Sequence, residues 1–196
     1  MFMTPFGYSR NCQPPRRLAW GISLLACLLG LAAPASAVTP ESPEVKAVIE
    51  KGLKYIVGEP DSRLGGICLA GVCFLKNGRG NDDPIVKQAL AACQKTESMK
   101  EHDNYSLGCA LIFLFEFDPQ QQQSLAGKYL AELLKRQMSN GGWSYEGYQT
   151  GDTSQTQYAV LGMWMAQRHG MQVPLPAIEK VTGWLLRTQD PNGGWG

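Results

Sequence analysis

The sequence has little net charge and no long apolar run, and each shortage excludes a class of function. It holds 18 Lys and Arg against 17 Asp and Glu, scattered along the chain, for a formal net charge of +1. A nucleic-acid surface needs clustered basic residues, so we expect no nucleic-acid partner. The apolar run from Leu18 to about Ala33 is shorter than the roughly 20 residues that span a bilayer, and Gly21 and Gly30 interrupt it. A permanent membrane anchor is therefore not expected.

Acidic residues are absent before Glu41, and this absence marks the N-terminal segment. Three arginines precede the apolar run, and small residues follow it up to Ala37. This order predicts a secretory signal peptide over residues 1–37 that is cleaved after Ala37. We expect the protein to be exported, to the periplasm or the extracellular space, and to contact the membrane only transiently. Two variants stay open: a twin-arginine signal at Arg16-Arg17 and a lipoprotein signal ending at Cys27.

Paired C-x-x-C spacing is also missing, which argues against a zinc site. Four cysteines remain after cleavage: Cys68, Cys73, Cys93 and Cys109. An oxidising compartment permits disulfides among them, but their spacing does not fix the pairing. Burial as small apolar side chains is the alternative.

The mature part, residues 38–196, contains one kind of segment four times. The segments that begin at Pro43 and at Pro84 both place valine and lysine shortly after the proline, about 41 residues apart. Residues 125–137 and 178–189 are of the same kind. Their apolar residues recur at helical spacing, which predicts amphipathic outer helices. Ser42 and Asp83 are expected to cap the first two, with proline at the first helical position.

Segments of a different composition lie between these outer helices, at residues 64–75, 104–117 and 153–166. They are apolar almost all round and rich in small residues, as expected for helices that are buried on every side. Each is about a dozen residues long without period-two alternation, so helix is favoured over strand. Because one hairpin cannot cover its own apolar face, the hairpins must stack. An open solenoid and a closed ring are both possible outcomes.

Two short motifs follow the third and fourth outer helices in register. Gln137 to Trp143 and Gln189 to Trp195 both have the pattern Q-x-x-N-G-G-W, and we name them the first and second QW turns. Asn-Gly-Gly tolerates positive φ and ends a helix, glutamine offers an amide to the helix end, and tryptophan packs on the turn. We therefore assign structural roles to Gln137, Gly141, Trp143, Gln189, Gly193 and Trp195.

The motif resembles the repeat of squalene and oxidosqualene cyclases, and the wider arrangement is similar to the prenyltransferase and squalene oxidase repeat family. The resemblance covers essentially all of the mature chain, although only the last two repeats carry the full motif. It implies an all-α fold of helical hairpins, an (α/α) toroid whose inner helices surround a cavity that opens at their N-terminal ends. Such a toroid has about six helices of each type, so we expect residues 38–196 to be an incomplete part of one.

Asp103 and Asp152 are the candidates for catalysis. The cyclases carry D-x-D-D-T at the start of an inner helix, whereas only Asp152 stands at that place here, without the neighbouring carboxylate that tunes an acid. Helix capping explains both aspartates and is favoured, with Gln155 expected to complete a capping box with Asp152. The zinc site that the resemblance to protein prenyltransferases implies is not expected, because Asp103 and Cys109 would lie on different helix faces. We expect no metal and no cofactor.

Five aromatic residues cluster around the third hairpin: Trp143, Tyr145, Tyr148, Tyr158 and Trp164. They could line a cavity that holds an isoprenoid or other apolar ligand, or stack on a sugar, with core packing as the favoured alternative. The first hypothesis is therefore a non-catalytic, cavity-binding or scaffold module whose partner is such a ligand or another protein. The alternatives are an isoprenoid cyclase whose acid motif lies in a missing C-terminal part, and a polysaccharide-acting (α/α)-barrel enzyme.

Overall fold

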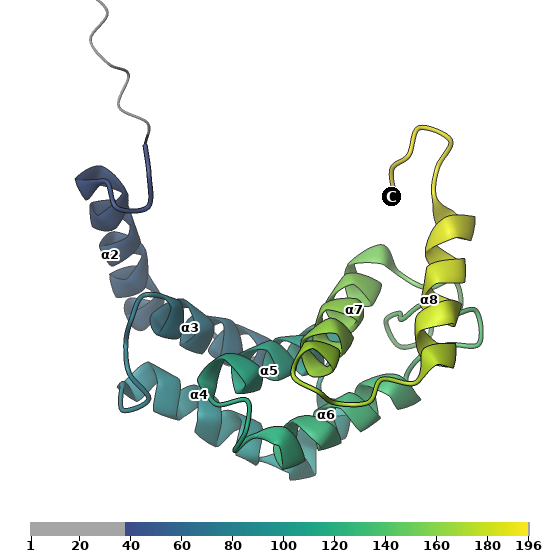
Figure 1. Ribbon diagram of the computed structural model, residues 1–196, viewed down its shortest axis with the longest axis horizontal. Coiled ribbons are helices and arrows are strands. Elements are labelled where there is room, and N and C mark those ends of the chain that lie inside the picture. Colours follow the sequence, from purple (N-terminus) through teal and green to yellow (C-terminus); the bar gives the residue numbers. More distant parts are fainter. Residues whose placement is uncertain (1–37, 196) are drawn as a thin grey trace, which may run out of the picture. The chain divides into compact units, whose positions relative to one another are not determined.

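The computed structural model describes residues 38–195, and within this range it is all-helical without a strand. The predicted signal peptide, residues 1–37, lies outside the described residues. The elements, in chain order, are α2 (Pro43–Gly58), α3 (Leu64–Lys76), α4 (Pro84–Gln94), η1 (Thr96–Glu101), α5 (Asn104–Phe117), α6 (Gln123–Lys135), α7 (Thr153–Arg168) and α8 (Leu175–Thr188) (Figure 1). The all-α fold class is thus confirmed.

The chain divides into two units, residues 1–46 and residues 47–196. The described part of the first unit holds a turn, in which the Thr39 N–H donates to Ser42 Oγ (3.0 Å), and the first residues of α2. An exposed ion pair joins Lys46 to Glu41 in this unit (2.7 Å). The second unit holds the rest of α2 and all the other helices.

Capping side chains start three of the helices at the expected residues. Asp83 accepts from the Ile85 N–H, Asp103 from the Ser106 N–H and Asp152 from the Gln155 N–H. Each carboxylate satisfies one of the N–H groups that the first turn of a helix leaves without an internal partner. The capping roles of these three aspartates are confirmed.

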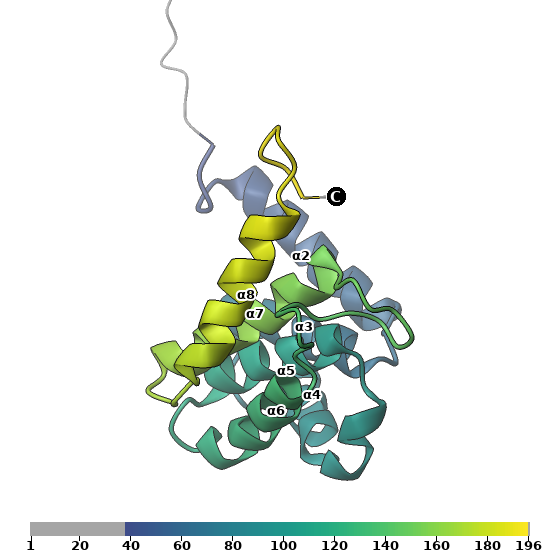
Figure 2. The same ribbon diagram turned by 90° about the vertical axis from the view of Figure 1, so that its right-hand side faces the viewer.

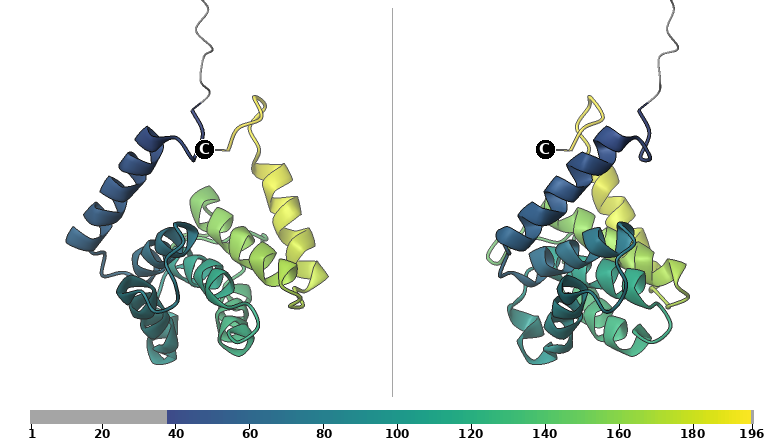
Figure 3. Two further views of the ribbon diagram at one scale, coloured as in Figure 1. Left: turned by 60° about the vertical axis from the view of Figure 1, so that its left-hand side comes forward. Right: turned by 90° about the vertical axis from the view of Figure 1, so that its left-hand side faces the viewer.

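The three helices that the sequence predicts as buried pack next to one another in chain order. α5 contacts α3 on one side and α7 on the other, while α4 packs on α3 and α6 on α5 (Figures 2 and 3). Ten of the 14 residues of α5 are buried. A Cβ on Gly108 would lie 2.4 Å from the Tyr158 carbonyl oxygen, so glycine is required for the close approach of α5 and α7.

The two QW turns share one set of local hydrogen bonds. In the first, the Gln137 amide donates to the Gly141 carbonyl (3.0 Å) and the Trp143 indole N–H donates to the Leu133 carbonyl (2.8 Å). In the second, the Gln189 amide donates to the Gly193 carbonyl (2.9 Å) and the Trp195 indole to the Leu185 carbonyl (2.9 Å). In each turn, therefore, glutamine closes the loop and tryptophan ties it to the preceding helix.

Within residues 38–195, only the first QW turn also holds another helix, α8. The Gln137 amide donates a second hydrogen bond to the Ala177 carbonyl in α8 (2.9 Å), and Gly141 lies directly against the backbone of Lys180. Trp143 is fully buried, whereas Trp195 is 43% exposed. The first QW turn thus anchors α8 to the helix layer.

None of the described helices combines the length and apolar character that crossing a membrane requires.

Candidate functional site

A cavity of about 710 Å³ opens where α5 and α7 begin. Its walls come from η1 and the start of α5, from the end of α6, and from the loop that follows the first QW turn. We name this cavity the amide–tyrosine basin. Its lining residues are Lys100, Glu101, His102, Asp103, Asn104, Glu132, Lys135, Arg136, Met138, Ser144, Tyr145, Glu146, Tyr148, Gln149 and Gln155.

Two buried amides in the basin wall have polar atoms without a partner. Gln155 is 1% exposed and Asn104 is 5% exposed. Among the described residues neither Gln155 Nε2 nor Gln155 Oε1 makes a hydrogen bond, and Asn104 Oδ1 makes none. Each such buried atom costs about 1–3 kcal/mol, so three of them in one wall indicate a place where a partner outside the described residues, such as a ligand or water, would add hydrogen bonds.

The backbone of the first QW turn explains why Gln155 is unpaired. In a capping box, this residue would reach back to the Asp152 N–H. That N–H already donates to the Trp143 carbonyl, at 2.7 Å. The capping box expected from the sequence is therefore wrong in its second half: Asp152 caps α7, but the Gln155 side chain stays free.

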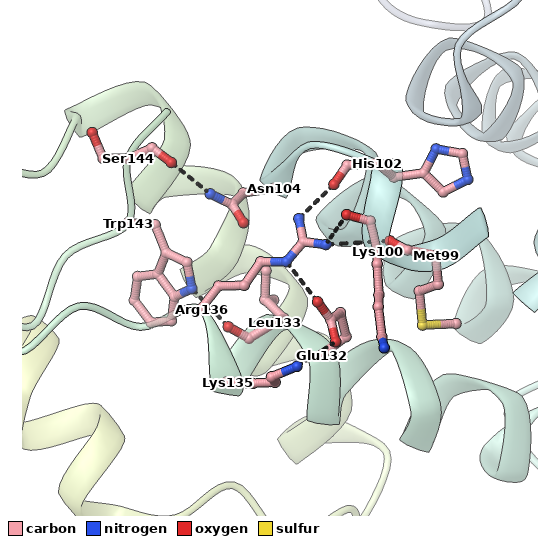
Figure 4. A network of polar contacts seen from close by, with 10 residues as sticks. All are labelled: Met99, Lys100, His102, Asn104, Glu132, Leu133, Lys135, Arg136, Trp143 and Ser144. Carbon is pink, nitrogen blue, oxygen red and sulfur yellow. Dashed lines mark hydrogen bonds and ion pairs between the residues drawn. The ribbon is translucent and has the colours of Figure 1, made fainter. Parts of the chain in front are cut away.

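The Asn104 amide is held in place from one side. Its Nδ2 donates to the Ser144 carbonyl at 3.2 Å, which leaves the Oδ1 atom free (Figure 4). The same loop continues from Trp143, whose indole is fixed on α6 (Figure 4). The loop thus orients one amide directly and takes away the capping partner of the other.

A chain of hydroxyl groups runs along the edge of the basin. The Tyr145 and Tyr105 hydroxyls are hydrogen-bonded (3.1 Å), Tyr105 donates to Ser154 Oγ, and Ser154 donates to Asp152 Oδ1. Tyr105 also packs edge-on against Tyr158, with ring centroids 5.0 Å apart. The chain links an exposed phenol to a carboxylate at the start of α7.

The hydroxyl chain changes the acidity of its tyrosines. The hydrogen bond between the Tyr105 and Tyr145 hydroxyls lowers the pKa of Tyr145. The Gln155 side chain favours the Tyr145 phenolate as well, although neither of its polar atoms forms a hydrogen bond within residues 38–195. The hydrogen bond with Ser154 acts to lower the pKa of Tyr105, but the Tyr145 hydroxyl and burial outweigh it, so that pKa is raised. Tyr145 is therefore the more acidic of the pair.

Arg136 forms the opposite wall, and four hydrogen bonds within the chain hold its guanidinium. It donates to Glu132 Oε1 (2.9 Å), to the Lys100 carbonyl (3.1 Å) and to the His102 carbonyl (Figure 4). Burial lowers the pKa of His102, which keeps the imidazole neutral near pH 7. The Arg136 charge is therefore engaged within the chain, and the other cations that line the basin are Lys135, 3.9 Å from Glu132, and Lys100.

The structure brings together only some of the aromatic residues predicted to bind. Tyr145 and Tyr148 line the basin, and Tyr158 lines an adjoining cavity of about 290 Å³ together with Asp103 and Tyr105. Trp143 is fully buried in the first QW turn. Trp164 is half exposed on α7, with the Arg168 guanidinium 5.2 Å from its ring centre, and it lines neither cavity.

The acidic candidates lie at the site but are engaged in capping. Asp103 lines the basin, and Asp152 lines an adjoining cavity of about 530 Å³ with Tyr145 and Tyr148. Asn104 and Gln155 were not among the predicted site residues. Polar amides at the starts of otherwise apolar helices were the sequence signal that would have found them.

No group of three or more His, Cys, Asp and Glu side chains suited to a metal ion occurs in the part of the chain that the structure describes. Compared with known proteins, the chain matches no family model, no curated protein and no solved structure. The assignment of function therefore depends on the geometry of the amide–tyrosine basin.

Proposed function

We propose that this chain is an exported helical-repeat protein of the squalene-cyclase and prenyltransferase type that binds a ligand in the amide–tyrosine basin. Three features support the repeat assignment: the consecutive packing of α3, α5 and α7, the placing of α4 and α6 on that layer, and the shared hydrogen bonds of the two QW turns. In this proposal the helices form part of an (α/α) toroid, with the basin at the N-terminal ends of its inner helices.

The ligand that fits this basin is a neutral carbohydrate. The observation that carries the proposal is the set of unpaired amide atoms on Asn104 and Gln155, which offer donors and acceptors to hydroxyl groups. The exposed faces of Tyr145 and Tyr148 lie beside them, with ring centroids 6.5 Å apart, and can stack on sugar rings. An isoprenoid would leave the same amide atoms unsatisfied, so an apolar ligand is disfavoured.

Calorimetric titration of the mature chain tests this proposal. The probes are hexasaccharides of cellulose, chitin, xylan and starch type, with farnesol as the apolar comparison. We expect at least one hexasaccharide to bind and farnesol not to bind. Gln155→Met should weaken that binding about tenfold or more, since a hydrogen bond to a buried amide is lost.

The matched control is Gln167→Met, which changes an exposed glutamine of the same helix. It should bind as the unchanged chain does. Because the Gln155 amide has no partner in the described residues, Gln155→Met should also leave thermal stability unchanged or raised, which separates a binding role from a structural one. Binding of farnesol alone, or equal affinities for both variants, would contradict the proposal.

A second candidate, a polysaccharide-acting enzyme, is favoured by one observation: the hydroxyl chain from Tyr145 to Asp152. A tyrosine of lowered pKa can exchange a proton with a bound sugar as a general acid or base. Incubation of the same hexasaccharides followed by mass spectrometry tests it. Shortened products that no longer form with the Tyr145→Phe variant would support an enzyme. Hexasaccharides that bind but stay intact would contradict the enzyme and support a binding module.

A further inference from the structure

Two cysteines face one another between α3 and α4. Cys68 Sγ and Cys93 Sγ are 3.4 Å apart, and both side chains are 0% exposed. The other two cysteines differ: Cys73 is exposed on α3, and Cys109 is buried in α5. The structure therefore selects one pair from four cysteines whose spacing left the pairing open.

The packing around this pair holds the two helices close together. A Cβ on Gly71 would lie 2.8 Å from the Ala89 Cβ, which shows that small side chains separate α3 from α4 there. The Tyr129 hydroxyl donates to the Cys93 carbonyl at 2.9 Å and fixes the end of α4 from α6. Both cysteines thus sit on mutually packed helices, with their sulfurs facing each other at 3.4 Å.

We infer that Cys68 and Cys93 form a disulfide bond in the exported protein, a covalent link between α3 and α4. The inference rests on the proposed export, because a reducing compartment would keep both thiols reduced. The oxidant is a protein or small-molecule disulfide. One cysteine thiolate attacks the disulfide of the oxidant, forms a mixed disulfide with it and releases one thiol of the oxidant. The other cysteine thiolate then attacks the mixed disulfide and releases the second thiol of the oxidant. Two cysteine thiols thus become one disulfide, and the oxidant becomes two thiols.

The bond forms during folding. The hydrogen bond with Cys93 and burial raise the pKa of Cys68, so the folded protein holds a neutral thiol that does not react. In the unfolded chain the thiols are accessible to an oxidant. Folding then brings the partners together, and burial protects the finished bond from reduction.

Peptide mapping of the refolded chain tests the inference. The full chain is unfolded and refolded in a mixture of oxidised and reduced glutathione, checked by circular dichroism, alkylated in denaturant and digested with trypsin. We expect residues 64–76 to be linked to residues 88–95. Because the first peptide also contains Cys73, the Cys73→Ala variant should keep the link and the Cys68→Ala variant should lose it.

Three results would overturn the inference: free alkylated thiols at both positions, a link that disappears in Cys73→Ala, or a link that persists in Cys68→Ala. If refolding is incomplete, the full chain is synthesised in a cell-free system that contains the same glutathione mixture, so that it folds in the presence of the oxidant, and mapping of this sample decides the question. Secretion is scored separately, by cleavage of the leader in a bacterial host. If the refolded chain carries the Cys68–Cys93 link but the protein is not secreted, the proposed export is refuted, while the ability of the fold to form this disulfide is supported.

Discussion

Comparing alanine substitutions at the two equivalent glycines of the QW turns, Gly141 and Gly193, shows how much the contact between the first QW turn and α8 contributes to stability. Gly141 has φ 103° and Gly193 has φ 89°, both in the region that side chains other than glycine avoid. A Cβ on Gly141 would lie 2.1 Å from the Lys180 carbonyl oxygen, whereas a Cβ on Gly193 meets nothing closer than the Gln189 amide at 3.9 Å. The two substitutions therefore share the backbone strain and differ in the clash with α8.

The expected costs follow from these two terms. Positive φ in an alanine costs about 1 kcal/mol, so Gly193→Ala should lower the free energy of unfolding by about that amount. Gly141→Ala also displaces the α8 backbone. Inserting a methyl group where there is no space typically costs about 1–3 kcal/mol, so we expect this variant to lose about 2 kcal/mol more. In a chain of this size the two losses correspond to decreases in Tm of roughly 3 °C and 9 °C.

Urea denaturation of the mature chain, followed by circular dichroism, gives both free energies. We expect Gly141→Ala also to lower the urea dependence of the free energy if α8 detaches, since less surface is then buried in the folded state. Equal losses for the two variants would refute the argument, because they would show that contact between the first QW turn and α8 contributes nothing to stability.

Three further predictions concern the tryptophans, a helix cap and a tyrosine. Trp143→Phe should lower the free energy of unfolding by about 3 kcal/mol in urea denaturation, through a lost indole bond in a fully buried place, whereas Trp195→Phe, at a half-exposed position, should lower it by under about 1 kcal/mol. Asp152→Ala should cost about 1 kcal/mol and Asp152→Asn should cost little, since asparagine also caps a helix; a large cost for Asn would show that the charge matters beyond capping. In a carbon-13 NMR titration, Tyr145 should ionise below the ordinary tyrosine pKa of 10.0, and the Tyr105→Phe substitution should raise the pKa of Tyr145. The stability linked to Tyr145 ionisation is present above pH 10.0 and is lost as the pH falls through the lowered pKa.

Much of the helical order was predictable because packing demands leave a clear pattern. α5 is apolar on nearly every side, and the structure buries it between α3 and α7. The short helix η1 was missed, since its sequence, TESMKE, has no apolar spacing to mark it. α8 begins at Leu175, earlier than the expected Ile178, because Pro176 is tolerated in the first helical turn, where no N–H partner is needed.

The site was less predictable, because its key contacts join residues far apart in the sequence. Tyr145 and Tyr148 were expected from the local density of aromatic residues, and they line the basin. Gln155 was assigned to capping, since local spacing alone suggested it. The backbone contact from Asp152 to Trp143 that prevents this role arises only when the loop folds back on α7. Sequence spacing has no access to such a contact.

The first QW turn and the loop that follows it determine which polar groups of the amide–tyrosine basin stay unpaired. A helix start has a limited number of N–H donors and nearby acceptors, and any donor that the loop takes is lost to the helix's own side chains. The Trp143 carbonyl takes the Asp152 N–H, so the Gln155 amide is left without its local partner while packing keeps it buried. The next carbonyl, that of Ser144, takes one side of the Asn104 amide and leaves its oxygen free. The first QW turn, which fastens α8, and the loop that continues from it thus leave unpaired the groups that the proposed ligand would bind, and such binding would add stability.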